Sequence, residues 1–368
     1  MRIFVSAGEP SGDLHAAPVV AALRRRLPGV IIDGLGGPAM EAAGAQLRFR
    51  MEDYSAFGLA EVVTHVPRHY RLFRQLRREF RRGVYQLLIV IDYPGFHIRL
   101  GEAARAAGVP VLYYIAPQLW AWWPGRARRL ARAADRLAVI LPFEPPFFSA
   151  LGLPTEFVGH PLIESAPQIA SADARRRLGI GEDQRVLAIF PGSRRQEVVR
   201  HWPIFRAAAE RLLAEGACDQ VLVAMTGELE CPSPGKLKLV RGEPTLVLAA
   251  ADAVLAKSGT TTLEAALADT PMVVAYRINS LTHRIFQLVR RVRWFSLVNL
   301  VAERAVVPEL LQDEVTVDEL CRAVRPLLDS NSEAATKQRA ALAEVRSRLG
   351  TPGAADRVAE LAAELLGA

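Results

Sequence analysis

The feature of this sequence that most constrains its fold is a repeated order of short apolar segments, each followed by a polar loop and a helical segment. The first example is the apolar segment 2–6, the loop 8–13 and an Ala-rich amphipathic stretch that ends at Arg26. Similar segments rich in β-branched residues follow at 30–34, 87–92, 111–115, 137–141 and 156–159. Apolar strands that alternate with helices are typical of a parallel sheet covered on both faces, so the sequence predicts an α/β fold.

The same order starts again in the second half of the chain. Residues 161–184 are polar, and a new apolar segment at 185–190 leads into a Gly-containing loop. Further strands are predicted at 220–224, 237–241, 253–256 and 272–276, with a helix at 261–268. We therefore expect two Rossmann-like, doubly wound parallel-sheet domains facing a cleft, at 1–165 and 166–345, and a C-terminal helix at 346–368 that packs back on the first domain.

Composition excludes several classes of protein. With 51% hydrophobic residues the chain can build cores, unlike a disordered chain. Cys218, Cys231 and Cys321 are far apart, which argues against a zinc site and a disulfide framework and fits a reducing compartment such as the cytoplasm. We expect no metal and no cofactor. The N-terminus is unlike a signal peptide, and the longest apolar stretches are shorter than the ~20 residues that cross a bilayer.

The net charge of +7 is carried by arginine, because only four of the 46 basic residues are lysines. This bias suits phosphate binding, although a GC-rich genome would produce it equally well. Three segments interleave arginine with aromatic residues, at 67–82, 119–129 and 281–298. Any one of them could be a core helix with a solvated face, but the three together favour a surface that meets anionic lipid. Nucleic-acid binding is a weaker interpretation, because a substrate with phosphate explains the same charge.

Loops at the expected carboxyl ends of the strands contain the candidate site residues. The loop 8–13 combines glycines, a hydroxyl and acids that allow close approach to a ligand; its candidate residues are Gly8, Glu9, Ser11, Gly12 and Asp13. Asp92 ends an apolar strand and is a candidate general base. Helix capping for the first loop and an Asx turn for Asp92 are the structural alternatives. We expect structural roles for His97 and His160.

Two loops in the second half together predict a diphosphate site. Ser193 and Arg194 follow one strand, and Ser258, Gly259 and Thr260 open a helix whose amides and dipole attract anions. Arg194 can donate to two phosphate oxygens, and Glu264 can accept ribose hydroxyls. Ordinary capping chemistry explains either loop alone, but it explains both together less well.

The chain resembles the bacterial lipid-A-disaccharide synthases, which are glycosyltransferases of the two-Rossmann GT-B type. The resemblance spans nearly the whole chain and is carried by AGEPSGD (7–13), IDYPGFH (91–97), APQLWAWW (116–123), LPFEPPFF (141–148), FVGHPL (157–162), FPGSRRQEV (190–198), KSGTTTLEAAL (257–267), PMVVAYR (271–277) and VPELLQDE (307–314). It implies inverting transfer of 2,3-diacylglucosamine from its UDP donor to 2,3-diacylglucosamine 1-phosphate, with release of UDP.

The resemblance also implies residue roles. Asp92 matches the family's base, and Arg194, Ser258, Gly259 and Thr260 match its diphosphate-side motifs. Glu264, Asn299, Glu309 and Gln312 match its nucleotide-side positions. Because two acyl chains keep a substrate in the bilayer, the resemblance implies a peripheral protein at the cytoplasmic face of the inner membrane. A homo-oligomer is possible, but the sequence does not determine the oligomeric state.

The sequence departs from the family pattern close to the implied base. The family usually has an acid and an amide where this chain has Gly95 and His97. The alternatives are another UDP-sugar glycosyltransferase or epimerase of the same fold, and a non-catalytic homologue that binds nucleotide sugar or lipid. The presence of Asp92 speaks against the non-catalytic alternative.

Overall fold

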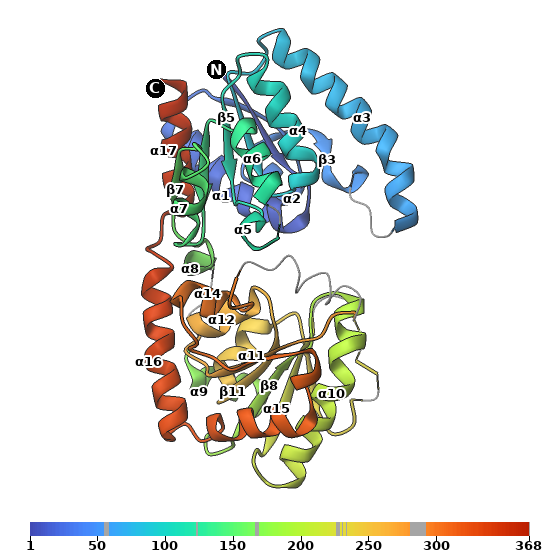
Figure 1. Ribbon diagram of the computed structural model, residues 1–368, viewed down its shortest axis with the longest axis vertical. Helices are drawn as coiled ribbons and strands as arrows, with labels where there is room; N and C mark the ends of the chain where they lie inside the picture. The colour runs from blue at the N-terminus through green and yellow to red at the C-terminus, as the bar shows by residue number, and fades with distance from the viewer. Residues whose placement is uncertain are drawn as a thin grey trace. The chain divides into compact units, whose positions relative to one another are not determined.

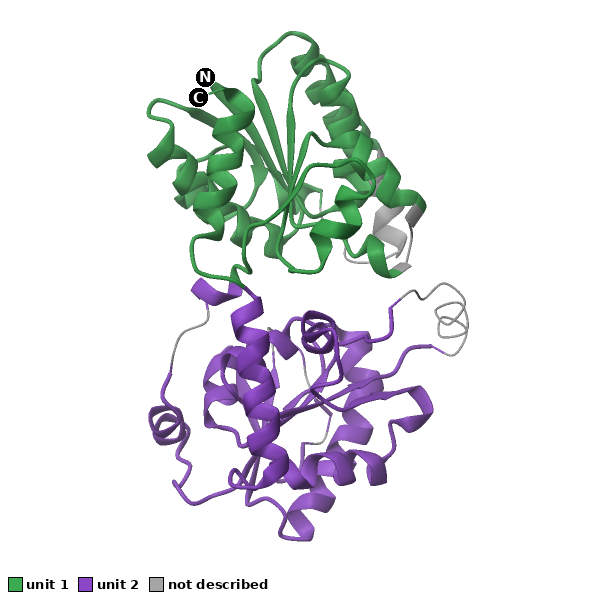
Figure 2. Cartoon of the chain, turned by 60° about the vertical axis from the view of Figure 1, so that its left-hand side comes forward, with its two compact units in different colours: residues 1–161, 350–368 green, residues 162–349 purple. Residues whose placement is uncertain are grey.

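The computed structural model describes residues 1–54, 59–122, 124–165, 169–225, 229, 231–232, 234–279 and 292–367. The chain divides into two compact units, shown in different colours in Figure 2. Unit 1 comprises residues 1–161 and 350–368, and unit 2 comprises residues 162–349. Each unit contains one parallel sheet, which confirms the predicted fold class of two Rossmann-like domains.

Unit 1 is built on a seven-stranded sheet in the order β3-β2-β1-β4-β5-β6-β7. Its strands are β1 (Arg2–Ala7), β2 (Ile31–Gly36), β3 (Gln46–Arg50), β4 (Leu87–Ile91), β5 (Val111–Tyr114), β6 (Arg136–Val139) and β7 (Thr155–Phe157). Every residue of β4 is buried, as both faces of a central parallel strand must be. The strand order reverses between β1 and β4, where an open α/β sheet places its ligands.

Helices cover both faces of the first sheet (Figure 1). They are α1 (Pro10–Arg26), α2 (Pro38–Ala42), α3 (Leu59–Arg81), α4 (Pro94–Arg105), α5 (Leu119–Trp122), α6 (Pro124–Ala133), α7 (Glu144–Ser149) and α17 (Ala354–Leu366), with a 3-10 turn at Met51–Asp53. The last helix packs on α1, where Arg25 and Arg26 form ion pairs with Asp356 and Glu360. Its apolar face, including Val358, belongs to the same core as β1 and β4.

Unit 2 contains a six-stranded parallel sheet in the order β10-β9-β8-β11-β12-β13. Its strands are β8 (Val186–Phe190), β9 (Gln220–Met225), β10 (Lys238–Arg241), β11 (Ala253–Lys257), β12 (Met272–Tyr276) and β13 (Glu309–Leu311). Its helices are α8 (Leu162–Ser165), α9 (Ser171–Leu178), α10 (Arg195–Ala214), α11 (Pro244–Ala250), α12 (Thr261–Leu267), α14 (Leu297–Ala302), α15 (Val317–Val324) and α16 (Glu333–Arg348), with 3-10 turns at Gln312–Glu314 and Arg325–Leu327. The order reverses between β8 and β11, which places the second switch point there.

Two strands of the structure were not predicted. Both β3 and β13 lie at sheet edges. The residues of β3 alternate between polar and apolar, and β13 has only three residues. Within the part of the chain that the structure describes, no helix is long and apolar enough to cross a membrane.

Candidate active site

The loops after β1 and β4 meet at the switch point of unit 1, because these strands are hydrogen-bonded neighbours. A side chain at Gly8 would place its Cβ 2.4 Å from the ring of Tyr93, so only glycine fits there. Glu9 is exposed and close enough to Asp92 for their charges to interact. The structure therefore brings together the first predicted loop and the predicted base.

Asp92 follows β4 directly and has an unusual backbone conformation. Its φ angle is 48°, and that of Tyr93 is 47°, so two consecutive non-glycine residues are left-handed. The Asp92 N–H donates to the carbonyl of Tyr114 at 3.0 Å. The Asp92 carbonyl accepts from the Tyr113 hydroxyl at 2.6 Å and from Nδ1 of His97 at 2.8 Å. These bonds fix the peptide from which the carboxylate projects.

The electrostatic environment raises the pKa of Asp92 to about 6. Burial is the main cause, and the negative charge of Glu9 adds to it, whereas a backbone hydrogen bond from Tyr93 opposes it. A carboxylate with such a pKa is ionised at neutral pH and is a stronger base than an exposed aspartate. These are the properties that a general base needs.

The predicted loop 8–13 is shorter in the structure, because α1 begins at Pro10 and includes Ser11, Gly12 and Asp13. Ser11 is exposed at the start of α1, and Gly12 packs close to Ala7. The carboxylate of Asp13 is buried and accepts the backbone N–H groups of Gly37, Ala39 and Met40 at 2.8, 2.9 and 3.1 Å. In this geometry Asp13 supports the loop after β2, and its oxygens face protein amides.

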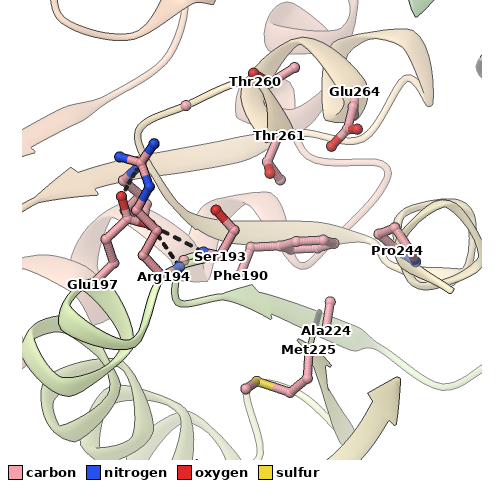
Figure 3. Close-up of a pocket in the computed structure, with 13 residues that line it drawn as sticks. Phe190, Ser193, Arg194, Glu197, Ala224, Met225, Pro244, Thr260, Thr261 and Glu264 are labelled. Atoms are coloured by element: carbon pink, nitrogen blue, oxygen red, sulfur yellow. Dashed lines mark hydrogen bonds and ion pairs between the residues drawn. The ribbon is translucent and has the colours of Figure 1, made fainter. Parts of the chain in front are cut away.

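The switch point of unit 2 contains a pocket of about 380 Å³. Its lining comes from the ends of β8, β9 and β11 and from the start of α12: Phe190, Gly192, Ser193, Arg194, Glu197, Ala224, Met225, Pro244, Lys257, Gly259, Thr260, Thr261 and Glu264. Figure 3 shows Ser193, Arg194 and Glu197 on one side of the pocket and Glu264 on the other. Five predicted residues, Ser193, Arg194, Gly259, Thr260 and Glu264, thus line one pocket.

A partly buried ion pair organises one wall of this pocket. Glu197 Oε1 lies 2.9 Å from Nζ of Lys257, and Glu197 Oε2 accepts the N–H of Ser193 at 3.1 Å. Burial alone would raise the pKa of Glu197, but these partners outweigh it and lower the pKa. Gly192 has a φ of 130°, and a Cβ there would lie 2.5 Å from that of Glu197. Glutamate and glycine together therefore set the shape of the loop that carries Arg194.

Four further candidates of unit 2, Ser258, Asn299, Glu309 and Gln312, do not line this pocket and make contacts within the protein. Ser258 donates its hydroxyl to the Phe295 carbonyl at 2.9 Å. Glu309 accepts hydrogen bonds from the backbone N–H groups of Phe295 and Ser296 and from the side-chain amide of Asn299. Asn299 is fully buried. The side chain of Gln312 pairs with both backbone groups of Ile278. The structure gives these residues positioning contacts around the carboxyl ends of β11 and β12.

Glu264 also contributes to a second, larger pocket of about 540 Å³ on unit 2. Apolar residues such as Ile163, Leu248 and Leu267 line much of it. Burial raises the pKa of Glu264, which makes this carboxylate a good hydrogen-bond acceptor for a neutral hydroxyl.

Sequence reasoning missed three residues of the two sites. It gave His97 a structural role without seeing its contact to Asp92, and it overlooked Glu197 and Lys257. A signal existed for the last two. Glu197 stands three positions after Arg194 at a helix start, the spacing at which a side chain reaches back to the loop, and Lys257 is a charge at the end of an otherwise buried strand. Within the described residues, no group of three His, Cys, Asp or Glu side chains could hold a metal ion.

The three predicted segments of basic and aromatic residues differ in how their side chains are buried and in how much of them the structure describes. On α3, Leu72, Leu76 and Phe80 are buried, and the arginines among them are exposed. Trp120 is also buried, and its Nε1–H donates to Glu144 at 3.0 Å, so this indole anchors its own loop. Most of the segment 281–298 lies outside the described residues.

Two parallel-sheet units, each with polar loops at its switch point, define the two-Rossmann fold of the GT-B type. The solved structure of CalG4, the calicheamicin glycosyltransferase, has a TM-score of 0.58 and 19% identity, with 100% of this chain and 98% of that chain covered. The solved structure of the UDP-GlcNAc 2-epimerase from Neisseria meningitidis bound to UDP-GlcNAc has a TM-score of 0.66 and 10% identity, with 100% of this chain and 99% of that chain covered. The fold alone therefore does not separate transferase from epimerase.

The chain belongs to the lipid-A-disaccharide synthetase family, whose model matches residues 3–363. The lipid-A-disaccharide synthase of Myxococcus xanthus is 40% identical over 375 residues, which cover 99% of this chain and 97% of that protein. This confirms the resemblance, identifies the protein as an enzyme, and does not favour the epimerase or the non-catalytic alternative.

Proposed function

We propose that this enzyme transfers 2,3-diacylglucosamine from UDP-2,3-diacylglucosamine to 2,3-diacylglucosamine 1-phosphate, and that Asp92 is the general base. Family membership supports the reaction. The observation that carries the assignment of the base is a half-buried carboxylate with a pKa of about 6 at the switch point of unit 1.

The reaction is one displacement at the anomeric carbon of the donor sugar. The acceptor hydroxyl oxygen forms the new bond to that carbon while the Asp92 carboxylate takes the hydroxyl proton. The bond to the diphosphate oxygen breaks, and UDP leaves with the electron pair. Because attack and departure occur on opposite faces, the configuration at this carbon inverts, and the expected linkage is β-1,6.

The pocket in unit 2 suits the nucleotide. Arg194 is exposed at its edge and can donate to the diphosphate, whose charge grows as the bond breaks. The hydroxyl of Thr260 and the N–H of Gly259 add neutral donors, and Glu264 can accept ribose hydroxyls. We propose this pocket as the UDP site, with Ser193 at the diphosphate end.

We further propose that the protein binds peripherally to the cytoplasmic face of the inner membrane. Each buried CH₂ contributes ~0.8 kcal/mol, so a substrate with two acyl chains stays in the bilayer and the enzyme must reach it there. The exposed arginines of α3 and its end support this surface: Arg68, Arg71, Arg74, Arg77, Arg78, Arg81 and Arg82. Each can contribute ~1 kcal/mol at an anionic surface.

The test of the chemistry is UDP release by purified protein given the diacylated donor, with and without the acceptor. We expect release that depends on acceptor and falls at least a hundredfold in Asp92→Asn, with UDP affinity unchanged. Asp356→Asn on the exposed side of α17 is the matched control and should keep full activity. Equal release by Asp92→Asn would remove Asp92 as the base, and release without acceptor would favour another reaction.

The test of the membrane surface is sedimentation with vesicles of neutral or anionic lipid. The triple variant Arg71→Gln, Arg74→Gln and Arg78→Gln removes charges from one helix face and should lose binding to anionic vesicles. Arg176→Gln with Arg322→Gln removes exposed charges from unit 2 and should bind like the native protein. Equal losses in both variants would mean that net charge, and no particular surface, attracts the lipid.

A further inference from the structure

The conformation of Asp92 requires an explanation that its own sequence neighbours do not supply. Left-handed φ angles at Asp92 and Tyr93 are costly for residues with a Cβ, and neither is glycine. A loop keeps such a conformation only when surrounding groups fix it. The contacts that do so here converge on the Asp92 carbonyl oxygen, which accepts hydrogen bonds from Tyr113 and His97.

The hydrogen bonds of His97 define its tautomer. Its Nδ1 lies 2.8 Å from the Asp92 carbonyl, which can only accept, so Nδ1 carries the proton. Its Nε2 lies 2.8 Å from the Ser6 hydroxyl. Because burial lowers the pKa of His97 to about 4, the ring is neutral at neutral pH, and Nε2 accepts the Ser6 proton. The imidazole thus links the end of β1 to the peptide of Asp92.

If His97 only filled space in the core, its ring nitrogens would not both need hydrogen-bond partners. Here both nitrogens are hydrogen-bonded, and His97 and Ser6 have no exposed surface. The ring also contacts Tyr93 and Tyr113 edge-on, at 5.5 and 6.5 Å between ring centres. The aromatic rings hold the imidazole in the plane that both bonds need.

We propose that His97 is a positioning residue for catalysis: its Nδ1–H holds the Asp92 peptide in the left-handed conformation that aims the carboxylate, and Ser6 fixes the imidazole. The proposal rests on the proposed function, in which Asp92 is the base. Nothing in it requires His97 to touch substrate. A displacement of about 1 Å at a catalytic group can reduce a rate ~100-fold, so the bond to the carbonyl has a kinetic consequence.

Two isosteric substitutions separate the two nitrogens. In His97→Asn the side-chain amide reaches the place of Nδ1 and can still donate to the Asp92 carbonyl, whereas in His97→Gln it reaches the place of Nε2 and cannot. We expect His97→Asn to keep kcat within about threefold and His97→Gln to lose about 30- to 100-fold, with the donor KM unchanged in both. Equal losses in kcat would overturn the proposal, as would losses that follow the change in Tm in both variants.

A double-mutant cycle tests the second contact. Ser6→Ala removes the partner of Nε2 and should lower kcat about two- to threefold in the native background. In the His97→Asn background, where no ring nitrogen reaches Ser6, the same substitution should have no further effect. Additive losses would show that Ser6 acts independently of His97 and would overturn this part of the proposal.

A measurement that needs no activity keeps this proposal separate from the proposed function. Long-range ¹H–¹⁵N spectra of histidine-labelled protein should show a neutral His97 with the proton on Nδ1, and Ser6→Ala should shift the Nε2 resonance. A proton on Nε2 would overturn the proposal even in an active enzyme. The expected tautomer in a protein that releases no UDP would instead mean that the assigned reaction is wrong while the positioning contact exists.

Discussion

Lowering the pH from about 8 to about 5 should reduce kcat/KM for the acceptor about tenfold. The proposed base, Asp92, can take a proton only when it is ionised, and its pKa is raised to about 6. At a pH one unit below that pKa only about 9% of the enzyme carries the carboxylate, whereas an aspartate with an ordinary pKa would be about 94% ionised. The loss therefore appears as pH falls, and its midpoint reports the free enzyme. The assay is UDP release at subsaturating acceptor between pH 4.5 and 8.5.

The acceptor phosphate also titrates near pH 6, so the profile needs a control that changes only the enzyme. Glu9→Gln removes the negative charge that helps to raise the pKa of Asp92. The acid limb of the variant should move to lower pH, with about two- to fivefold recovery of the rate at pH 5 relative to its own plateau. An identical limb in both proteins would assign the titration to the substrate, and a flat profile down to pH 5 would refute the raised pKa.

Three further variants test buried contacts and glycine positions in the two units. Asp13→Asn should lower the free energy of unfolding by about 1–3 kcal/mol in urea, because one buried oxygen that accepts backbone N–H groups is lost; native stability would contradict this. Gly192→Ala should weaken UDP binding more than tenfold by calorimetry, since its Cβ meets Glu197, whereas Gly216→Ala, which has free space, should bind UDP normally. Arg175→Met should cost about 3–5 kcal/mol and lower Tm, because the buried guanidinium binds several carbonyl oxygens; a small change would show that water replaces it.

The central strands were all predicted from the sequence, and the two strands that were missed, β3 and β13, both lie at sheet edges. The other edge strands, β7 and β10, match the predicted segments 156–159 and 237–241. A strand such as β4 is buried on both faces and is therefore a continuous apolar run, which has few other interpretations. The edge strand β3 has one exposed face and contains two arginines, and β13 has three residues. Neither contains enough apolar residues to stand out from a loop.

The positions of the sites were predictable because polar residues directly after buried strands must gather at one sheet edge. The roles of individual residues were less so. Asp13 and Asp92 both follow a buried strand, and the sequence does not show that Asp13 lies in the first turn of α1 and binds three backbone amides, whereas Asp92 is half-buried in a loop. The contact between His97 and Asp92 depends on the left-handed backbone between them, which the dipeptide Asp-Tyr does not indicate.

Helix α17 changes the order in which the two units can finish folding during synthesis. Residues 1–161 leave the ribosome first, but their core also needs Val358, Ala359 and Leu361 of α17, which are made after the whole of unit 2. Unit 2 is continuous in sequence and can complete its core earlier. The usual amino-first order of domain folding is thereby reversed, and a nascent chain exposes the apolar face of unit 1 until α17 has been made. Deletion of α17 would therefore damage the half of the molecule that was made first.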